Sequence, residues 1–372
     1  MFGPCAADHG DRPLSDPATP GSASGSRRVA LALDALRHGW PIALEDAFTL
    51  LPAETGFAPG TASRHMLISA ARAATLKLAN QREAAEPDAP VLIRGAELFD
   101  LALARAIADP GLDLAFPLKG PFLAEPIANP QAAATALELA RLAGILPAFL
   151  VNPQHAGEAS AVASADLAAW RNTDQLVIAA RARLPIGACE TAEIIAFRSA
   201  DDLREHVALV LGQQSGDSAP LVRLHSECLT GDVLGSLKCD CGPQLDAALD
   251  EMAAATRAGG WGVLLYLRQE GRGIGLINKL RAYQMQDQGF DTVDANTRLG
   301  LPTEARDFPV AARMLALMGV NAVRLLTNNP AKLAALEAAG VAVLERVPHH
   351  LPANPHNVRY LATKRDRAGH LL

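Results

Sequence analysis

The sequence predicts a protein of the α/β or α+β class that is built from two domains. Its 372 residues exceed the length of one average domain. Hydrophobic residues make up 49% and charged residues 20% of the chain, which is ordinary for a globular protein with packed cores. Expected helices and strands alternate along both halves. We expect domains over residues 28–172 and 176–372.

Composition and charge exclude several classes of protein. The net charge is -6, so no global basic field attracts nucleic acid, and a polyanion would need a local cluster of cations. The longest apolar stretch, 132–151, contains Glu138, Arg141 and Pro147, which argues against a membrane span. The first residues hold no apolar run flanked by positive charge, so a secretory signal is not expected. We therefore expect a cytoplasmic protein that binds neither nucleic acid nor membrane.

The N-terminal half begins with a segment that we expect to be disordered. Residues 1–27 are rich in Pro, Gly, Ser and Asp and lack periodic apolar positions. Residues 152–175 are small and polar enough to serve as a connection between the domains. The elements expected between them are a helix over 28–39 that stops at Gly39, a strand over 41–44, a helix over 129–142 ended by Gly144, and a buried strand over 145–151.

The C-terminal half has sharper boundaries. A helix over 243–260 places Leu245, Ala248, Leu249 and Met252 on one face. A later helix begins at Asn329, a good N-cap residue, followed by Pro330 in the first turn. The other expected elements are strands over 221–227, 263–268, 322–327 and 341–347 and a helix over 276–287.

The strongest chemical signal is a group of closely spaced cysteines, Cys228, Cys239 and Cys241, of the form C-x10-C-x-C. Thiolates are favoured zinc ligands, and three protein ligands leave the fourth position open to water, as in catalytic zinc sites. Zinc in such a site lowers the pKa of bound water toward neutrality. Cysteines are also often merely buried, and His225 as a fourth ligand would make the site structural. The tight spacing beside Gly and Asp favours a zinc site.

Two loops have features that suit a phosphate. Residues 268–275, RQEGRGIG, join a strand to a helix, with glycine amides and the planar donors of Arg268 and Arg272. On this evidence alone, a surface turn with solvated arginines is the better interpretation of the loop. Residues 327–332, TNNPAK, follow a buried strand and place Lys332 in the first turn of a helix, where a cation is unfavourable unless an anion lies nearby. A capped surface helix explains the same residues.

Taken together, these segments resemble the GTP cyclohydrolase II family. RLHSECLTGDVLGSLKCDCGPQL, LYLRQEGRGIGLINKLRAYQMQDQGFDTVDAN, ARDF and LLTNNPAK are similar to its signature segments, in the same order, from about Ala179 to the C-terminus. The resemblance implies zinc-dependent opening of the imidazole ring of GTP, with release of C8 as formate and of pyrophosphate. The implied product is 2,5-diamino-6-ribosylamino-4(3H)-pyrimidinone 5′-phosphate, in the first step of riboflavin biosynthesis.

The resemblance also implies a set of site residues. Cys228, Cys239 and Cys241 would hold one zinc ion, and Mg²⁺ would accompany the triphosphate. Arg306, Glu304 and Tyr283 would be catalytic. The residues implied to bind GTP are Arg223, Leu224, His225, Ser226, Glu227, Gln244, Glu270, Gly271, Arg272, Thr292, Thr327 and Lys332. A homodimer is expected.

Three of these assignments leave alternatives open. The family commonly has aspartate at the position of Glu304, so the general base is either Glu304 or Asp307. Arg306 matches an arginine proposed to attack the α-phosphorus, but the high pKa of arginine equally allows an electrostatic clamp. Tyr283 is an aromatic residue on a helix face, where packing is the usual role.

The N-terminal half resembles 3,4-dihydroxy-2-butanone 4-phosphate synthase. RVALALDALRHGWPIAL and ALELARLAGILPAFLV carry this similarity. The acidic loop of that family is missing after IALEDA, and Gln131, Ala132 and Ala133 stand where it has Gly-His-Thr. We therefore expect a degenerate domain without synthase activity.

Two other functions compete with a working cyclohydrolase. One is a GTP-binding paralogue or regulator with a structural zinc site and no ring-opening activity. The other is a fused scaffold in which the N-terminal domain mediates dimerisation. Tyr283, Arg306 and the three cysteines favour the enzyme, because a binding protein needs none of their chemistry.

Overall fold

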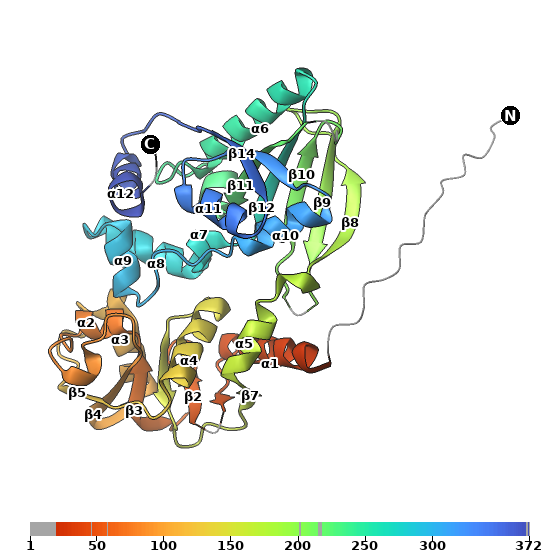
Figure 1. Cartoon of the computed structure of the whole chain (residues 1–372). Helices are drawn as coiled ribbons and strands as arrows, with labels where there is room; N and C mark the ends of the chain where they lie inside the picture. The colour runs from red at the N-terminus through yellow and green to blue at the C-terminus, as the bar shows by residue number, and fades with distance from the viewer. Residues whose placement is uncertain are drawn as a thin grey trace.

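The computed structural model describes residues 20–45, 47–57, 59–200, 202–214, 218–369 and 371. They form two lobes, each built on a seven-stranded sheet with helices packed on it (Figure 1). The N-terminal lobe contains α1 to α5, and the C-terminal lobe contains β8 to α12. This agrees with the α/β (α+β) class expected from the sequence. Within the described part of the chain, no helix combines the length and apolar character needed to cross a membrane.

The N-terminal lobe is a mostly antiparallel sheet in the order β5-β4-β3-β6-β2-β1-β7, with β1 and β7 parallel. Its strands are β1 (Ile42–Leu44), β2 (Phe48–Pro52), β3 (Ala62–Ile68), β4 (Val91–Asp100), β5 (Phe122–Glu125), β6 (Ala148–Val151) and β7 (Ser160–Val162). Its helices are α1 (Pro20–Arg37), α2 (Ala70–Thr75), α3 (Leu101–Ala108), α4 (Pro130–Ala143) and α5 (Ser164–Trp170), with 3-10 turns η1 (Arg82–Ala84) and η2 (Pro110–Leu112).

The two long helices of this lobe end where the sequence predicted. The side chain of Asn129 accepts a hydrogen bond from the Ala132 amide and caps α4, and Gly144 ends it in the left-handed conformation, with φ 79°. α1 and α4 cover one face of the sheet, where Val29 and Leu139 are fully buried. Their apolar spacing therefore serves a core rather than a surface.

Two expectations about this half were wrong. Helix α1 begins at Pro20, so residues 20–27 of the expected disordered arm are helical, and the rest of that arm lies outside the described residues. Residues 152–175 are more than a connection, because they contain β7, α5 and the turn η3 (Thr173–Gln175). Asp166 of α5 accepts a hydrogen bond of 2.7 Å from Arg28 Nε of α1, an ion pair that local composition does not reveal.

The C-terminal lobe is a mixed sheet in the order β14-β13-β11-β12-β10-β9-β8. Its strands are β8 (Val177–Arg183), β9 (Ala192–Arg198), β10 (His206–Leu211), β11 (Leu221–Ser226), β12 (Gly262–Leu267), β13 (Ala322–Leu326) and β14 (Ala342–Val347). The helices are α6 (Cys241–Arg257), α7 (Glu270–Gly273), α8 (Leu276–Asp287), α9 (Thr292–Arg298), α10 (Pro309–Leu317), α11 (Pro330–Ala338) and α12 (Val358–Ala368), with the π-helical turn η4 (Leu229–Val233). The last four expected strands and the helices beginning near 243, 276 and 329 are all present.

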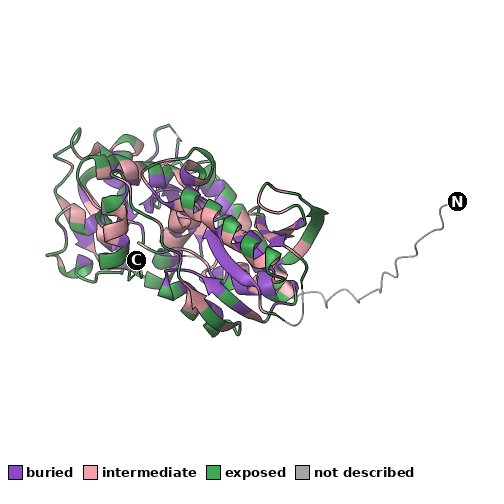
Figure 2. Ribbon diagram, turned by 90° about the horizontal axis from the view of Figure 1, so that it is seen from above, coloured by how far each residue is buried: buried purple, intermediate pink, exposed green. Residues whose placement is uncertain are grey.

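The strand directions decide where the site lies. β12, β11, β13 and β14 are mutually parallel, whereas β10, β9 and β8 extend the sheet in antiparallel fashion. Both faces of this sheet are covered: α10 packs on one, and α6 packs on the other through Ala248 and Met252, as its spacing predicted. Figure 2 shows buried strands and exposed outer helix surfaces, whereas the edge strands β8 and β14 are mostly exposed or half-buried. The carboxyl ends of the parallel strands remain as the edge at which α/β folds bind ligands.

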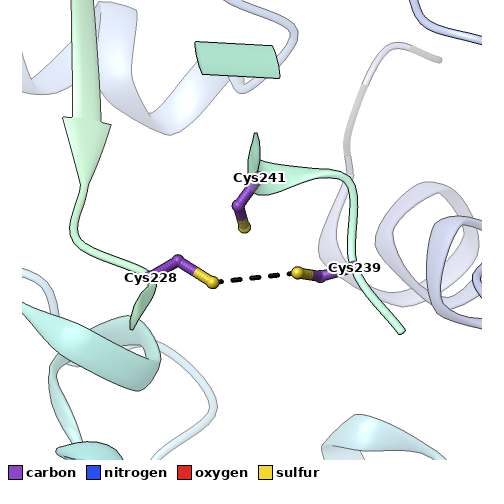
Figure 3. A group of neighbouring side chains, drawn as sticks. All are labelled: Cys228, Cys239 and Cys241. Atoms are coloured by element: carbon purple, nitrogen blue, oxygen red, sulfur yellow. Dashed lines mark hydrogen bonds between the residues drawn. The ribbon is translucent and has the colours of Figure 1, made fainter. Parts of the chain in front are cut away.

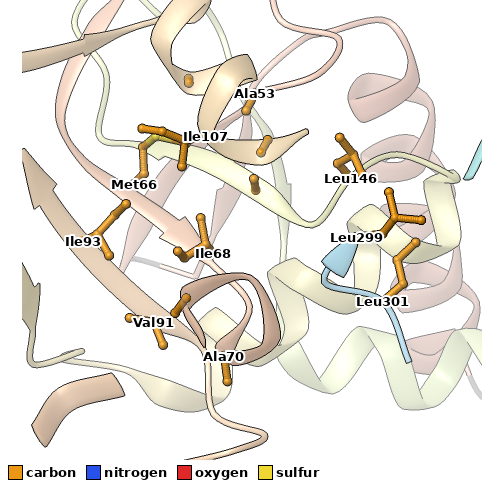
Figure 4. Packing of buried hydrophobic residues seen from close by; sticks show 14 of the residues in the cluster. Ala53, Met66, Ile68, Ala70, Val91, Ile93, Ile107, Leu146, Leu299 and Leu301 are labelled. Carbon is orange, nitrogen blue, oxygen red and sulfur yellow. The ribbon is translucent and has the colours of Figure 1, made fainter. Parts of the chain in front are cut away.

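The two lobes share one hydrophobic core. α8 and α9 lie between the sheets (Figure 1), and their buried residues Ala282, Met285 and Ala295 join the core of the N-terminal lobe. Leu299 and Leu301 reach toward Leu146 (Figure 4). The C-terminal lobe is therefore incomplete without its neighbour, because these apolar side chains would otherwise face water.

We predict that Leu299→Ala lowers the free energy of unfolding by about 2–5 kcal/mol, because it leaves a cavity in the shared core. Leu299 is 1% exposed. The measurement is urea denaturation, followed both by circular dichroism and by fluorescence of Trp40, Trp170 and Trp261, which report on both lobes. Leu118→Ala is the control, because Leu118 is 95% exposed and its loss costs little. A Leu299→Ala variant as stable as this control would contradict a shared core.

Candidate active site

A pocket lined by many charged and polar side chains lies at the carboxyl ends of β11 and β12. Its free volume is about 940 Å³ including the open mouth, within the range of small-molecule sites. α6, α8 and α12 contribute side chains to its walls. The sequence-predicted residues that line it are Arg223, His225, Ser226, Glu227, Cys228, Cys239, Cys241, Gln244, Glu270, Gly271, Arg272, Tyr283, Thr292, Arg306 and Lys332.

Three predicted site residues, Leu224, Thr327 and Glu304, do not line the pocket. Leu224 is packed in the core, and only its backbone oxygen faces the site, where it accepts a hydrogen bond of 2.6 Å from Lys332 Nζ. Thr327 is buried, and its hydroxyl accepts a hydrogen bond of 3.1 Å from the Asn329 amide. Leu224 and Thr327 therefore support the turn that presents Lys332.

The three cysteines converge on one point (Figure 3). Their Sγ atoms all lie within 4.8 Å of one another, and those of Cys228 and Cys239 are 3.7 Å apart. Cys228 follows β11. Cys239 lies just before α6 and Cys241 is the first residue of that helix, after the η4 turn has brought the chain back. Tetrahedral zinc at about 2.3 Å from each thiolate requires sulfurs roughly 3.8 Å apart. The cluster is therefore compatible with zinc.

In the thiol cluster, formed by Cys228, Cys239 and Cys241, the pKa of each thiol depends on the other two. Hydrogen bonds from Cys239 and Cys241 hold the pKa of Cys228 well below its ordinary value, and Lys279 acts in the same direction. The bond with Cys228 in turn raises the pKa of Cys239 and of Cys241. Without a metal ion, these shifts favour a thiolate at Cys228 beside two thiols, whereas a divalent cation favours three thiolates.

Lys279 connects the thiols to the 268–275 loop. Its Nζ lies 3.1 Å from Cys228 Sγ, 2.8 Å from Thr230 Oγ1 and 2.9 Å from Glu270 Oε1. Burial alone would lower the pKa of Lys279, but the hydrogen bonds with Glu270 and Cys228 outweigh it and raise the pKa. The ammonium group therefore stays charged beside the cluster.

His225 is not part of the thiol cluster. Its Nε2 lies 3.0 Å from Asp232 Oδ1, and its ring stacks on Tyr266. The metal-ligand group found in the described residues contains the three cysteines alone. The structure therefore gives no support to a fourth ligand from His225.

The pocket is strongly cationic. The basic residues that line it are Arg223, Arg272, Lys279, Arg306, Lys332 and Lys364, whereas Glu227 and Glu270 are the acidic ones. Burial lowers the pKa of Arg223 to about 10, and it lowers that of Lys332 well below the ordinary value, with help from the charges of Arg306 and Arg223. A polyanion would relieve the repulsion among these groups.

Two buried polar atoms at the end of β11 have no partner among the described residues. They are Arg223 Nε and Ser226 Oγ, and both side chains line the pocket. The Nη2 atom of Arg223 donates to Gln244 Oε1 at 2.5 Å, so that side chain is already oriented. Because unsatisfied buried donors are rare, these atoms indicate a place for a polar ligand or water.

The 268–275 loop adopts a costly backbone conformation. Gly271, Arg272, Gly273 and Gly275 have φ values of 63°, 61°, 88° and 86°. Glycine tolerates positive φ, but for Arg272 it is a strained conformation of the kind found at functional sites. Glu270 fixes the start of the loop by accepting a hydrogen bond of 2.7 Å from the Leu229 amide. The loop is therefore a shaped part of the pocket rather than a solvated turn, although Arg268 itself does not line the pocket and pairs with Glu227 of the pocket wall.

Arg306 and Glu304 form a tight ion pair at the rim of the pocket. Arg306 Nε donates to Glu304 Oε1 at 2.7 Å, and Nη2 donates to Oε2. Burial alone would raise the pKa of Glu304, but Arg306 outweighs it and lowers the pKa. Asp307 lines a separate cavity with His206 and Arg204, and burial raises its pKa. The geometry thus places Glu304, and not Asp307, beside the pocket.

Sequence reasoning missed several residues that line the pocket: Lys279, Gln286, Asn296, Tyr360 and Lys364. Lys279 precedes Tyr283 by four residues on α8, so helical spacing gave a usable signal. Asn296 is buried on α9, and only tertiary structure places it. Tyr360 and Lys364 come from α12. Lys364 Nζ donates a hydrogen bond of 2.6 Å to Asp240, the residue between Cys239 and Cys241 in the sequence. Nothing local in the sequence links that helix to the site.

A family model described as GTP cyclohydrolase II matches residues 177–348, the part of the chain that contains the thiol cluster and most of the pocket. Residues 177–348 form a GTP cyclohydrolase II domain. The domain therefore begins with β8 and ends just after β14, and α12 closes the pocket from beyond the matched residues.

Two curated relatives show the same similarity. The chain is 50% identical over 250 residues to GTP cyclohydrolase-2 of Azospirillum brasilense, covering 64% of each protein. It is 52% identical over 259 residues to the riboflavin biosynthesis protein RibBA of Salinispora arenicola, covering 64% of this chain and 60% of that one. The chain thus spans less than two thirds of the length of these relatives.

A solved structure also aligns with the chain. It is that of RibBX, a two-domain 3,4-dihydroxy-2-butanone 4-phosphate synthase from A. baumannii, with 17% identity over 88% of this chain and all of the other. The TM-score is 0.27, too low to support a common arrangement of the lobes.

Proposed function

We propose that this protein hydrolyses GTP to 2,5-diamino-6-ribosylamino-4(3H)-pyrimidinone 5′-phosphate, formate and pyrophosphate, the first step of riboflavin biosynthesis. The observation that carries the proposal is the meeting of three clustered thiols and six cationic side chains in one pocket of a GTP cyclohydrolase II domain. The thiols suit a metal ion, and the cations suit a triphosphate. GTP has a group for each: its purine ring for the metal centre and its triphosphate for the cations.

Cys228, Cys239 and Cys241 are proposed to hold one zinc ion. The Cys228–Cys239 separation of 3.7 Å matches a tetrahedral site, all three sulfurs lie within 4.8 Å of one another, and three thiols leave a fourth position for chemistry. Bound zinc supplies Lewis-acid activation of the nucleophile for ring opening. Lys279 stays charged beside Cys228 and offsets part of the excess negative charge of three thiolates.

The triphosphate is proposed to lie against Arg223, Arg272, Arg306 and Lys332, accompanied by Mg²⁺. Arg223 and Lys332 are held by hydrogen bonds to Gln244 and to the Leu224 carbonyl, so they pay little ordering entropy on binding. Preorganised cations stabilise the charge that develops on departing pyrophosphate. The other predicted GTP contacts complete the walls of the pocket. They are His225, Ser226, Glu227, Gln244, Glu270, Gly271 and Thr292.

Arg306 is proposed to act as an electrostatic clamp. Glu304 fixes its guanidinium through two hydrogen bonds, an arrangement that suits an oriented donor to phosphate better than an attacking nucleophile. Because its pKa is lowered, Glu304 remains ionised and is able to accept a proton during ring opening. Tyr283 lies in the pocket wall near Lys279, whose Nζ is 5.8 Å from the ring centroid.

The competing function is a GTP-binding regulator with a structural metal site. Both proteins would bind GTP, so binding does not separate them. The deciding experiment is incubation of the purified protein with GTP and Mg²⁺ and assay of formate and the pyrimidine. Binding of GTP without formate would favour the regulator.

The proposal also includes a cytoplasmic homodimer, and sedimentation of the purified protein measures the oligomeric state.

We predict that Cys228→Ser loses its zinc and its formate production but still releases pyrophosphate, because ring opening and pyrophosphate release occur at opposite ends of GTP. Elemental analysis should find one zinc per wild-type chain. Cys189→Ser is the matched control, because Cys189 lies outside the cluster and contacts Thr191. Formate production by Cys228→Ser at the wild-type rate would refute the assignment of the metal ligands.

We predict that Arg306→Lys lowers the turnover number at least about tenfold, or ~1.4 kcal/mol of transition-state stabilisation, because lysine lacks the planar fork. Steady-state kinetics with GTP measures this. Arg324→Lys makes the same change in a surface ion pair with Glu345 and should have no effect. An unchanged turnover number in Arg306→Lys would remove Arg306 from the site.

We predict that the N-terminal lobe has no dihydroxybutanone phosphate synthase activity. Rearrangement of a sugar phosphate needs a divalent metal and acid/base groups, and Ala132 and Ala133 are buried in the α4 packing. The measurement is incubation with ribulose 5-phosphate and Mg²⁺. Clear formation of dihydroxybutanone phosphate would show that this lobe retains a working site.

A further inference from the structure

The end of α4, in the N-terminal lobe, touches the active-site backbone of the C-terminal lobe. Arg141 Nη1 donates a hydrogen bond of 2.9 Å to the carbonyl of Gly273 and lies 3.5 Å from that of Ala305. Glu138, one turn earlier on α4, accepts from Arg141 Nε at 2.7 Å and from Nη2 at 2.6 Å. The guanidinium is therefore oriented on one side by its own helix and on the other by the neighbouring lobe.

The two carbonyls belong to the segments that carry Arg272 and Arg306. Gly273 directly follows Arg272, and Ala305 directly precedes Arg306. The segments also bond each other, because the Ala305 amide donates to the Arg272 carbonyl at 3.1 Å. They approach so closely that a Cβ on Gly273 would lie 2.4 Å from the Ala305 oxygen. One side chain of the N-terminal lobe thus sits over the junction of two pocket segments.

This junction needs an external restraint. Arg272 has φ 61°, a conformation that costs free energy in any residue with a Cβ unless surrounding contacts impose it. Arg141 supplies a charged donor, and hydrogen bonds from charged groups are stronger than neutral ones. Its side chain is 12% exposed, so water competes weakly for the bonds.

A second set of contacts fixes the neighbouring helix. Asn278 Nδ2 of α8 donates to the Gly144 carbonyl at 3.2 Å, and Arg281 pairs with Glu54 through bonds of 3.0 and 3.1 Å. α8 also carries Lys279 and Tyr283. The N-terminal lobe therefore holds both the loop and the helix that border the pocket.

We propose that the N-terminal lobe serves as a positioning platform for the GTP site, with Arg141 as its positioning residue. Arg141 lines no part of the pocket. It acts by holding the Gly273 and Ala305 carbonyls. This fixes the directions in which the neighbouring Arg272 and Arg306 side chains point. The inference rests on the proposed function only where it concerns catalysis, because the restraint on the loop is measurable without substrate.

The test compares Arg141→Gln with Arg37→Gln in the full chain. Arg37 of α1 is a matched control, because it also donates to carbonyls at the end of α4, those of Ala143 and Leu142, and both of these bonds stay within the N-terminal lobe. Hydrogen exchange measures peptides covering 269–276 and 303–307. Arg141→Gln should speed their exchange about three- to tenfold, whereas Arg37→Gln should not.

Kinetics with GTP forms the second arm of the test. Arg141→Gln should lower kcat/KM about tenfold with a rise in KM for GTP, because misdirected arginines bind phosphate less well. A merely smaller folded fraction would lower kcat and leave KM unchanged. Arg141→Lys retains a charged donor to Gly273 and should recover part of the loss.

The outcomes separate the two proposals. Unchanged exchange in Arg141→Gln overturns the restraint, whatever the kinetics show. Faster exchange with unchanged KM and kcat overturns the role of the restraint in the site. A wild-type protein that forms no formate from GTP overturns the proposed function instead, while the exchange measurement still decides whether Arg141 holds the loop.

Discussion

Repulsion among the cations that face one pocket is the constraint on which the rest of the structure depends. Arg223 and Lys332 are buried, and burial lowers the pKa of both. Each is held by a polar partner that orients it without neutralising it, Gln244 for Arg223 and the Leu224 carbonyl for Lys332. Such an arrangement costs stability in the free protein. Binding of an anion would restore that stability.

The cationic side chains of the site are held in place by many different strands and helices. The parallel strands β11 and β12 deliver Arg223 and the 268–275 loop, α8 delivers Lys279 and Tyr283, and α12 closes the far side. The shared core then fixes α8 and α9 against the N-terminal lobe. In that lobe, α4 and Glu54 contact the segments that border the pocket.

The sequence predicted most of the C-terminal lobe because its signals are local. The alternation of buried strands with capped helices located β11, β12, β13 and α11, and the cysteine spacing located a metal-ligand group. Leu224 and Thr327 were placed among the GTP contacts by family resemblance, but their side chains face the core or the backbone. A motif identifies a segment, whereas the direction of each side chain depends on strand alternation and packing.

Other features depend on contacts between distant residues, which local patterns do not contain. The Arg28–Asp166 pair explains why α5 packs as part of the N-terminal lobe instead of serving as a linker. Lys364 reaches Asp240 across more than a hundred residues of chain. The contact of Arg141 with Gly273 is of the same kind. Periodicity and capping rules describe short stretches of chain and are silent about such pairs.

We propose that one pocket both binds the triphosphate and opens the purine ring. This proposal is tested most directly by following GTP labelled with ¹³C at C8 by NMR in the presence of the purified protein and Mg²⁺. We expect the label to move to formate at the rate at which the pyrimidine product forms. If the protein binds GTP and the label remains in the purine ring, the pocket is a binding site only and does not open the ring.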